Sequence, residues 1–256
     1  MAFVERLWAL RMFAWFVGIV SIVGLLIIAA TISIHRGPGH THLRTVAFGS
    51  VFAIAGYATC IMATMLTATL NRDRSHLAYI WTRPMARERI ALGYIAVDVV
   101  TILVAYTIVA GVTALVLSNL PGTHLVDDPN AAALLLRFAA LPLMWYALVE
   151  AATSWNTLRG GTAAGLSWAV FWGLLILAAV KLPVAIRAIV AVLNIFNPLA
   201  YFINEGQSTL YDPVTLSQVN ARDLIPLSYT AQTILAYAIF IGGCTVAAYA
   251  WKRMEA

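Results

Sequence analysis

The sequence predicts an all-α, polytopic membrane protein, and two observations lead to that prediction. Apolar residues make up 62% of the 256 residues and charged residues only 11%, whereas an ordinary soluble domain carries about 25% charged residues. The apolar residues also gather in runs of about 20 residues, the length that a helix needs to cross a hydrocarbon layer roughly 30 Å thick. We therefore expect a single transmembrane domain over residues 1–256, in the cytoplasmic (inner) membrane.

Six apolar runs are long enough to span a bilayer. The spans are expected at about residues 13–34, 45–70, 90–117, 131–154, 162–182 and 229–251. Residues 1–12 mix Phe, Leu and Trp with charged side chains, which predicts a helix lying at the membrane interface. Residues 183–202 are apolar, but Pro183 and Pro198 bound a stretch too short to cross. This segment is expected to be a re-entrant helix before the last span.

The distribution of basic residues predicts the orientation of the spans. With both termini in the cytoplasm, ten of the 16 Lys and Arg residues fall in inner segments, five in outer segments and Arg137 within a span. Cytoplasmic loops are enriched in Lys and Arg, so this excess favours cytoplasmic termini. Residues 35–44 are an exception, because they place two arginines and three histidines outside. The topology accounts for most of the basic residues, and no nucleic-acid partner is expected.

The connection between the second and third spans, residues 71–89, reads NRDRSHLAYIWTRPMARER and holds five arginines. Within it, Leu77, Ile80 and Trp81 recur at helical spacing, after polar residues that can cap a helix. Pro84 follows closely, and the residue before a proline avoids the helical region. This pattern predicts a short amphipathic helix at the cytoplasmic face that docks onto a soluble partner.

Three ionisable residues fall inside the expected spans, where such residues are costly and often functional. Asp98 lies about 12 Å from the inner end of the third span, at 1.5 Å per residue. Glu150 lies near the inner end of the fourth span and Arg137 near its outer end. Arg137 is expected to extend outward to the headgroups, and Glu150 can reach the inner headgroups. Asp98 is the hardest to explain in this way, and we take Asp98 and Glu150 as candidates for a translocation pathway.

No self-contained catalytic site is recognisable, so the chain is not expected to be an enzyme or to hold a cofactor or metal. It lacks a phosphate-binding G-x-x-x-x-G-K-[ST] loop and the H-E-x-x-H, G-x-S-x-G and C-x-x-C motifs. His35, His40 and His42 could ligate a metal, but no carboxylate or cysteine lies near them, which favours a solvated loop. Cys60 and Cys244 fall in apolar runs and are expected to be packing residues rather than a disulfide.

Residues 71–94 resemble the signature region of type-2 ATP-binding-cassette (ABC) permeases. In that family a charged cluster precedes a turn of Gly-Thr-Leu-acid type, an apolar stretch, a proline and a basic run that opens the third span. The matching positions here are 72–74, Leu77, 79–81, Pro84, 87–89 and Gly93, whereas Ser75, His76, Ala78 and Tyr94 depart from the family's residues.

The resemblance implies that the chain is the permease subunit of an ABC exporter. Its partners would be a second permease copy, identical or related, membrane lipid, and separate ATPase subunits that bind ATP and Mg. Residues 77–81 would form the coupling helix that seats in the ATPase. The implied coupling residues are Arg74, Leu77, Ile80, Trp81, Pro84 and Arg87.

Three other classes of function stay open from the sequence, and the substrate is not indicated. An ion-coupled transporter would carry several ionisable residues in its spans and paired broken helices. A membrane enzyme acting on lipids would use His35, His40 and His42 with Asp127 and Asp128. The last class is a non-transporting assembly factor or scaffold. Co-purification of a nucleotide-binding subunit separates the permease from all three.

Overall fold

The protein is a bundle of long apolar helices. The computed structural model describes residues 11, 13–20, 22–24, 26, 44–70, 86–120, 123–126, 129–155, 160–180, 182–203, 210–211, 218–219, 225 and 227–253. Five helices in this part of the chain are long and apolar enough to cross a membrane: α3 (Phe48–Leu70), α5 (Arg87–Asn119), α6 (Ala131–Trp155), α7 (Gly160–Ala179) and α10 (Tyr229–Arg253). The expected polytopic helical membrane protein is therefore confirmed.

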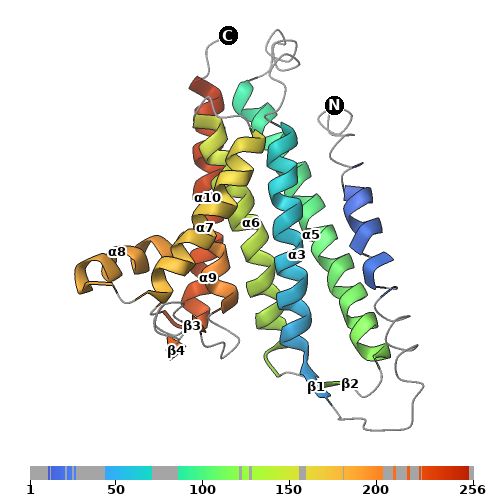
Figure 1. The fold of residues 1–256 in the computed structure, drawn as a ribbon. Helices are drawn as coiled ribbons and strands as arrows, with labels where there is room; N and C mark the ends of the chain where they lie inside the picture. Colours follow the sequence, from blue (N-terminus) through green and yellow to red (C-terminus); the bar gives the residue numbers. More distant parts are fainter. Residues whose placement is uncertain are drawn as a thin grey trace, which may run out of the picture.

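A shorter apolar helix, Phe13–Gly24, occupies the start of the expected first span. It lies beside α5 (Figure 1), where a Cβ at Gly24 would approach the Val116 side chain to 3.0 Å. Residues 27–34 of the expected span are outside the described residues, as is the expected interface helix 1–12 except for Arg11, which is helical. A membrane span at residues 13–34, which would bring the number of spans to six, therefore stays a prediction.

The long helices stand side by side and alternate in direction (Figure 1). At one end of the bundle, α3 ends, α5 begins and α10 ends, and Lys252 Nζ lies 3.6 Å from Glu88 Oε2 there. We call this the loop end, because the loop expected to bind a partner connects α3 to α5. At the other end, β1 (Arg44–Ala47) pairs in parallel with β2 (Thr123–Val126). We call this the strand end.

Four short strands correct the all-α prediction outside the spans. Besides β1 and β2, β3 (Leu210–Tyr211) pairs antiparallel with β4 (Gln218–Val219). The second span was expected from residue 45, but the chain stays extended until Phe48. Thr45 and Val46 are β-branched residues that favour an extended backbone, and they pair with His124 and Leu125 of β2.

The apolar segment expected to be one re-entrant helix forms two helices, α8 (Val184–Asn194) and α9 (Pro198–Ile203). The chain turns between them at Asn197, whose Nδ2 donates to the Phe171 carbonyl of α7 at 2.9 Å. Figure 1 shows α8 projecting away from the bundle, whereas α9 packs against α6 and α7. Helix α7, which corresponds to the fifth expected span, ends at Ala179, earlier than the expected residue 182.

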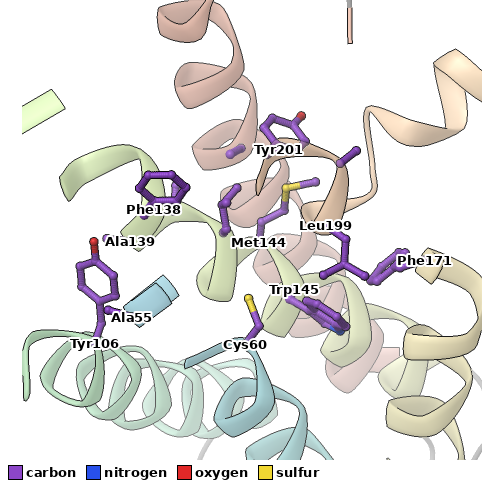
Figure 2. Packing of buried hydrophobic residues seen from close by; sticks show 14 of the residues in the cluster. Ala55, Cys60, Tyr106, Phe138, Ala139, Met144, Trp145, Phe171, Leu199 and Tyr201 are labelled. Atoms are coloured by element: carbon purple, nitrogen blue, oxygen red, sulfur yellow. The ribbon is translucent and has the colours of Figure 1, made fainter. Parts of the chain in front are cut away.

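Helix α6 is the most buried of the five long helices and contacts all the others. Figure 2 shows the larger apolar cluster, in which Phe138, Met144 and Trp145 of α6 meet residues of α3, α5, α7 and α9. The Trp145 ring centroid lies 4.2 Å from that of Trp168, and its indole N–H donates to Ser167 Oγ at 3.0 Å. The core of the molecule is therefore built around α6.

Small residues let α3 and α10 approach α6 closely. A Cβ at Gly243 of α10 would lie 2.9 Å from both the Cβ and the carbonyl oxygen of Ala147. A Cβ at Gly56 of α3 would lie 3.0 Å from the Phe138 carbonyl oxygen. Pro142 has no N–H to bond that carbonyl within α6, so the Phe138 oxygen faces the bare backbone of Gly56. Close helix contacts through glycine are a common means of packing in membranes, where apolar burial alone provides little attraction.

We predict that Gly243→Ala destabilises the bundle whereas Gly242→Ala does not. The added methyl at residue 243 meets the Ala147 backbone, while nothing lies within 4 Å of a Cβ at residue 242. Overpacking of this kind costs about 1–3 kcal/mol. The thermal unfolding midpoint in detergent measures the difference, and equal midpoints for the two variants would contradict the close approach of α10 to α6.

Candidate functional site

Most of the coupling residues expected from the sequence lie outside the described residues: Arg74, Leu77, Ile80, Trp81 and Pro84. Arg87 is the first residue of α5, and Ala86 is the N-cap. The expected coupling loop 71–89 therefore ends in helix, and its last three residues belong to α5. His35, His40, His42, Asp127 and Asp128 also lie outside the described residues.

Buried polar side chains contact α6 at three levels along the length of the bundle. The first level is at the strand end. Arg137 is only 2% exposed. Its Nη2 donates to Gln232 Oε1 of α10 at 2.9 Å and to the Tyr201 carbonyl of α9 at 3.2 Å. The expectation that Arg137 extends outward to the headgroups is therefore wrong, because the bundle itself supplies the acceptors.

Aromatic rings complete the environment of Arg137. Its Cζ lies 4.4 Å from the ring centroid of Tyr229 and 5.9 Å from that of Phe138. A guanidinium over an aromatic face is attracted by the ring quadrupole, more strongly when water is excluded. The Tyr201 hydroxyl donates to the Ile195 carbonyl at 2.8 Å, so the side chain of this α9 residue is held beside Arg137. Arg137 thereby joins α6, α9 and α10.

The second level is in the middle of the bundle, where Asp98 meets Tyr146. Asp98 is 0% exposed, and the Tyr146 hydroxyl donates to its Oδ2 at 2.8 Å. Asp98 lies 11 residues after the start of α5 at Arg87, which is about 16 Å along the helix at 1.5 Å per residue. Its contact with Tyr146 connects α5 to α6 in the middle of the bundle.

The third level is at the loop end, around Trp251 of α10. The Trp251 indole N–H donates to Ser154 Oγ of α6 at 3.1 Å, and Ser154 Oγ lies 3.4 Å from Glu150 Oε1. Glu150 is 1% exposed. The expectation that Glu150 reaches the inner headgroups is therefore wrong, since its carboxylate lies among α6 and α10 side chains.

The start of α5 joins this loop-end cluster. The Tyr94 ring lies 6.1 Å from the Trp251 ring, centroid to centroid, and Glu88 pairs with Lys252. The ion pair is exposed and contributes little to stability, whereas Tyr94 and Trp251 are almost fully buried. We define the loop-end clamp as Glu88, Tyr94, Ser154, Trp251 and Lys252. It fixes the first turns of α5 to the last turns of α6 and α10.

The described part of the chain offers no metal centre. It contains no group of three or more His, Cys, Asp or Glu side chains that could hold an ion. Cys60 and Cys244 are free thiols, as the sequence predicted. What the described residues do show is a set of polar contacts that connect α6 to α5, α9 and α10.

The partners of Arg137 and Glu150 were not predicted from the sequence. Arg137 was expected to reach the headgroups, and Gln232 and Ser154 were not among the candidate residues. A usable signal was present, because Gln232 is a polar residue near the strand-end start of α10 and Arg137 is the basic residue at the same end of α6. Searching each span for polar residues at matching depth would have suggested the Arg137–Gln232 pair.

Comparison of the sequence with models of protein families gave no match, and no curated protein matched it either.

We predict that Arg137→Ala lowers stability strongly and that Arg187→Ala does not. Truncating one partner of a buried polar network costs about 3 kcal/mol, or roughly 6–12 °C in Tm for a chain of this size. Arg187 of α8 is exposed and bonds only the Leu182 carbonyl, at 3.3 Å, among the described residues, so its loss should change stability by less than about 0.5 kcal/mol. Thermal unfolding in detergent measures both, and similar shifts would show that Arg137 is not a structural anchor.

Proposed function

We propose that this chain is the permease subunit of an ABC exporter, which forms the translocation pathway while a separate subunit hydrolyses ATP. The observation that carries the proposal is the segment 71–94, whose charged, apolar and proline positions resemble the type-2 permease signature. This segment connects α3 to α5 at the loop end of the bundle. Its arginines favour a cytoplasmic position for that end, and the ATPase subunit would bind there.

The loop-end clamp supports the proposal mechanically. A force on the coupling helix acts directly on the start of α5, and the clamp connects this region to α10 through Tyr94–Trp251 and to α6 through Trp251–Ser154. The three helices then move as one body. Closure of an ATPase dimer drives a rigid-body switch of this kind, between an inward-open and an outward-open arrangement.

The rest of the layout also supports a type-2 permease. In the sequence, two short helices, α8 and α9, lie between the long helices α7 and α10. They are at the end of the bundle away from the coupling segment. Both chain termini are on the cytoplasmic side in this proposal, and a second permease copy completes the pathway. ATP and Mg bind only to the partner subunit. Asp98 and Glu150, as buried acids next to moving helices, are the candidate residues of the pathway.

Burial of Asp98 and Glu150 favours one competing function, an ion-coupled transporter, because such carriers place acids inside their spans. The two functions differ in their energy source. Transport by the ion-coupled carrier would continue without ATP and stop when the ion gradient is dissipated. Transport by the proposed exporter requires ATP and continues after the gradient is dissipated.

We predict that Leu77→Ala combined with Trp81→Ala separates the permease from its ATPase without preventing membrane insertion. Both residues belong to the proposed coupling helix, and buried aromatic anchors tend to dominate interface energies. The loss should be tenfold or more in the amount of ATPase that co-purifies, on the order of 2 kcal/mol.

The matched control for this variant is Val100→Ala on α5, a large exposed side chain away from the loop end. It should retain the ATPase. Full retention of the ATPase by the Leu77/Trp81 variant would show that the segment 77–81 is not the coupling helix.

We also predict that Asp98→Asn assembles but changes the rate of ATP-driven transport, whereas Asp98→Leu is also damaged in packing. Asparagine keeps an oxygen that accepts the Tyr146 hydroxyl, but leucine removes that acceptor at a cost of roughly 1–3 kcal/mol. Size-exclusion profiles measure assembly, and transport in vesicles measures the rate. Normal transport by Asp98→Leu would exclude Asp98 from the pathway.

A further inference from the structure

The Tyr57 side chain carries a polar group into the apolar middle of α3. Residue 57 lies nine residues after the start of α3 at Phe48, about 14 Å along the helix, which is near the midplane of a hydrocarbon layer roughly 30 Å thick. The side chain is 38% exposed. Within the described part of the chain, no hydrogen bond joins its hydroxyl to another residue.

Four other tyrosine and tryptophan side chains in the long helices bond their polar atoms within the bundle, whereas the exposed Trp172 and Tyr249 make no hydrogen bond in the described part of the chain. The Tyr106 hydroxyl donates to the Leu135 carbonyl at 3.2 Å, and the half-buried Tyr237 donates to the Leu136 carbonyl at 2.9 Å. The indole N–H groups of Trp145 and Trp168 donate to Ser167 and Thr64. Tyr57 differs from the four bonded residues because its hydroxyl has no hydrogen bond among the described residues, and from Trp172 and Tyr249 because its ring packs against rings of two other helices.

Aromatic rings surround Tyr57 on the protein side. Its ring lies edge-on to Trp168 of α7, at 6.0 Å and 82°, and to Phe202 of α9, at 5.9 Å and 83°. The neighbouring Gly56 lets this part of α3 approach Phe202, which a Cβ would meet at 3.1 Å. We define the Tyr57 surface as the side chains of Tyr57, Trp168 and Phe202, contributed by three helices.

Acyl chains of the bilayer cannot accept a hydrogen bond from the Tyr57 hydroxyl. They offer no hydrogen-bond acceptor, and a hydroxyl without a partner in hydrocarbon is costly. The occupant of the Tyr57 surface must therefore present an acceptor at mid-membrane depth. The three aromatic rings in turn provide broad apolar contact, and none of the three side chains is charged, so recognition does not depend on an ion pair.

We propose that the Tyr57 surface binds the transported molecule, and that this molecule is an amphiphile with an apolar body and a hydrogen-bond acceptor that the Tyr57 hydroxyl bonds. The inference rests on the proposed permease function and specifies its substrate class. It assigns one wall of the pathway to α3, α7 and α9, in addition to the candidate residues Asp98 and Glu150 on α5 and α6.

The test uses a cysteine reporter on the full chain in phospholipid nanodiscs. Ile61→Cys, one turn from Tyr57 on the same face of α3, is introduced with Cys60→Ala and Cys244→Ala. A charged, membrane-impermeant methanethiosulfonate reagent modifies the reporter, and two probes with the same tail compete: dodecylphosphocholine, whose phosphate accepts hydrogen bonds, and dodecyltrimethylammonium, which has no acceptor.

We expect dodecylphosphocholine to slow the modification about fivefold more than dodecyltrimethylammonium, the effect of one net hydrogen bond. The same reporter with Tyr57→Phe should show no difference between the probes. A reporter at the exposed residue 100 of α5, Val100→Cys, is the control and should react only with a lipid-soluble maleimide.

Equal protection by the two probes in the presence of Tyr57 would overturn the proposal. Reaction of the residue 61 reporter with the lipid-soluble maleimide alone would show that acyl chains cover this surface, and a disulfide between two chains would show that a second copy covers it. Acceptor-dependent protection in a chain that never binds an ATPase would retain the amphiphile site but remove the ATP-driven function, so the two failures are distinguishable.

Discussion

The hydrogen bonds that α6 makes to its neighbours inside the apolar bundle determine how the other helices are placed. A polar group in the hydrocarbon layer is costly unless it has a hydrogen-bond partner, because neither bulk water nor acyl chains supply one. Arg137 meets this requirement through α10 and α9, Tyr146 through Asp98 of α5, and Ser154 through Trp251 of α10. Each bond fixes the depth of a neighbouring helix relative to α6, which apolar packing between similar side chains does not do.

Close packing and polar bonding act together along the α6–α10 contact. Gly243 brings the two backbones close to each other in the middle, the Arg137–Gln232 bond joins them near the strand end, and Trp251 joins them at the loop end. A pair of helices held at three levels behaves as one rigid unit. Because Tyr94 connects α5 to the same unit, a displacement at the start of α5 reaches the whole length of α6. In the proposed exporter, this connection transmits the work of the ATPase to the membrane.

The sequence predicted the long helices well because their length and hydrophobicity are properties of single segments. The expected spans at 131–154 and 229–251 differ from α6 and α10 by two residues or fewer at each end. Strand β1 was not predicted because it depends on pairing with β2, which is distant in the chain. The hydrogen bond of Arg137 was not predicted because its acceptor, Gln232, is also distant in the chain. Single-segment reasoning assigned Arg137 to the headgroups, since it could not identify an acceptor on α10. The coupling residues other than Arg87 lie outside the described residues, and their roles stay predictions.

The central claim is that this chain works as the membrane subunit of an ATP-driven complex, and the composition of that complex tests it most directly. Native mass spectrometry of the complex, solubilised gently from its own membrane, measures the subunits present. The account predicts two permease subunits, each the 27.7 kDa chain or one of them a relative, together with two copies of a nucleotide-binding subunit of unrelated sequence. A chain that is found alone or only with copies of itself, and that transports in the absence of ATP, would contradict it.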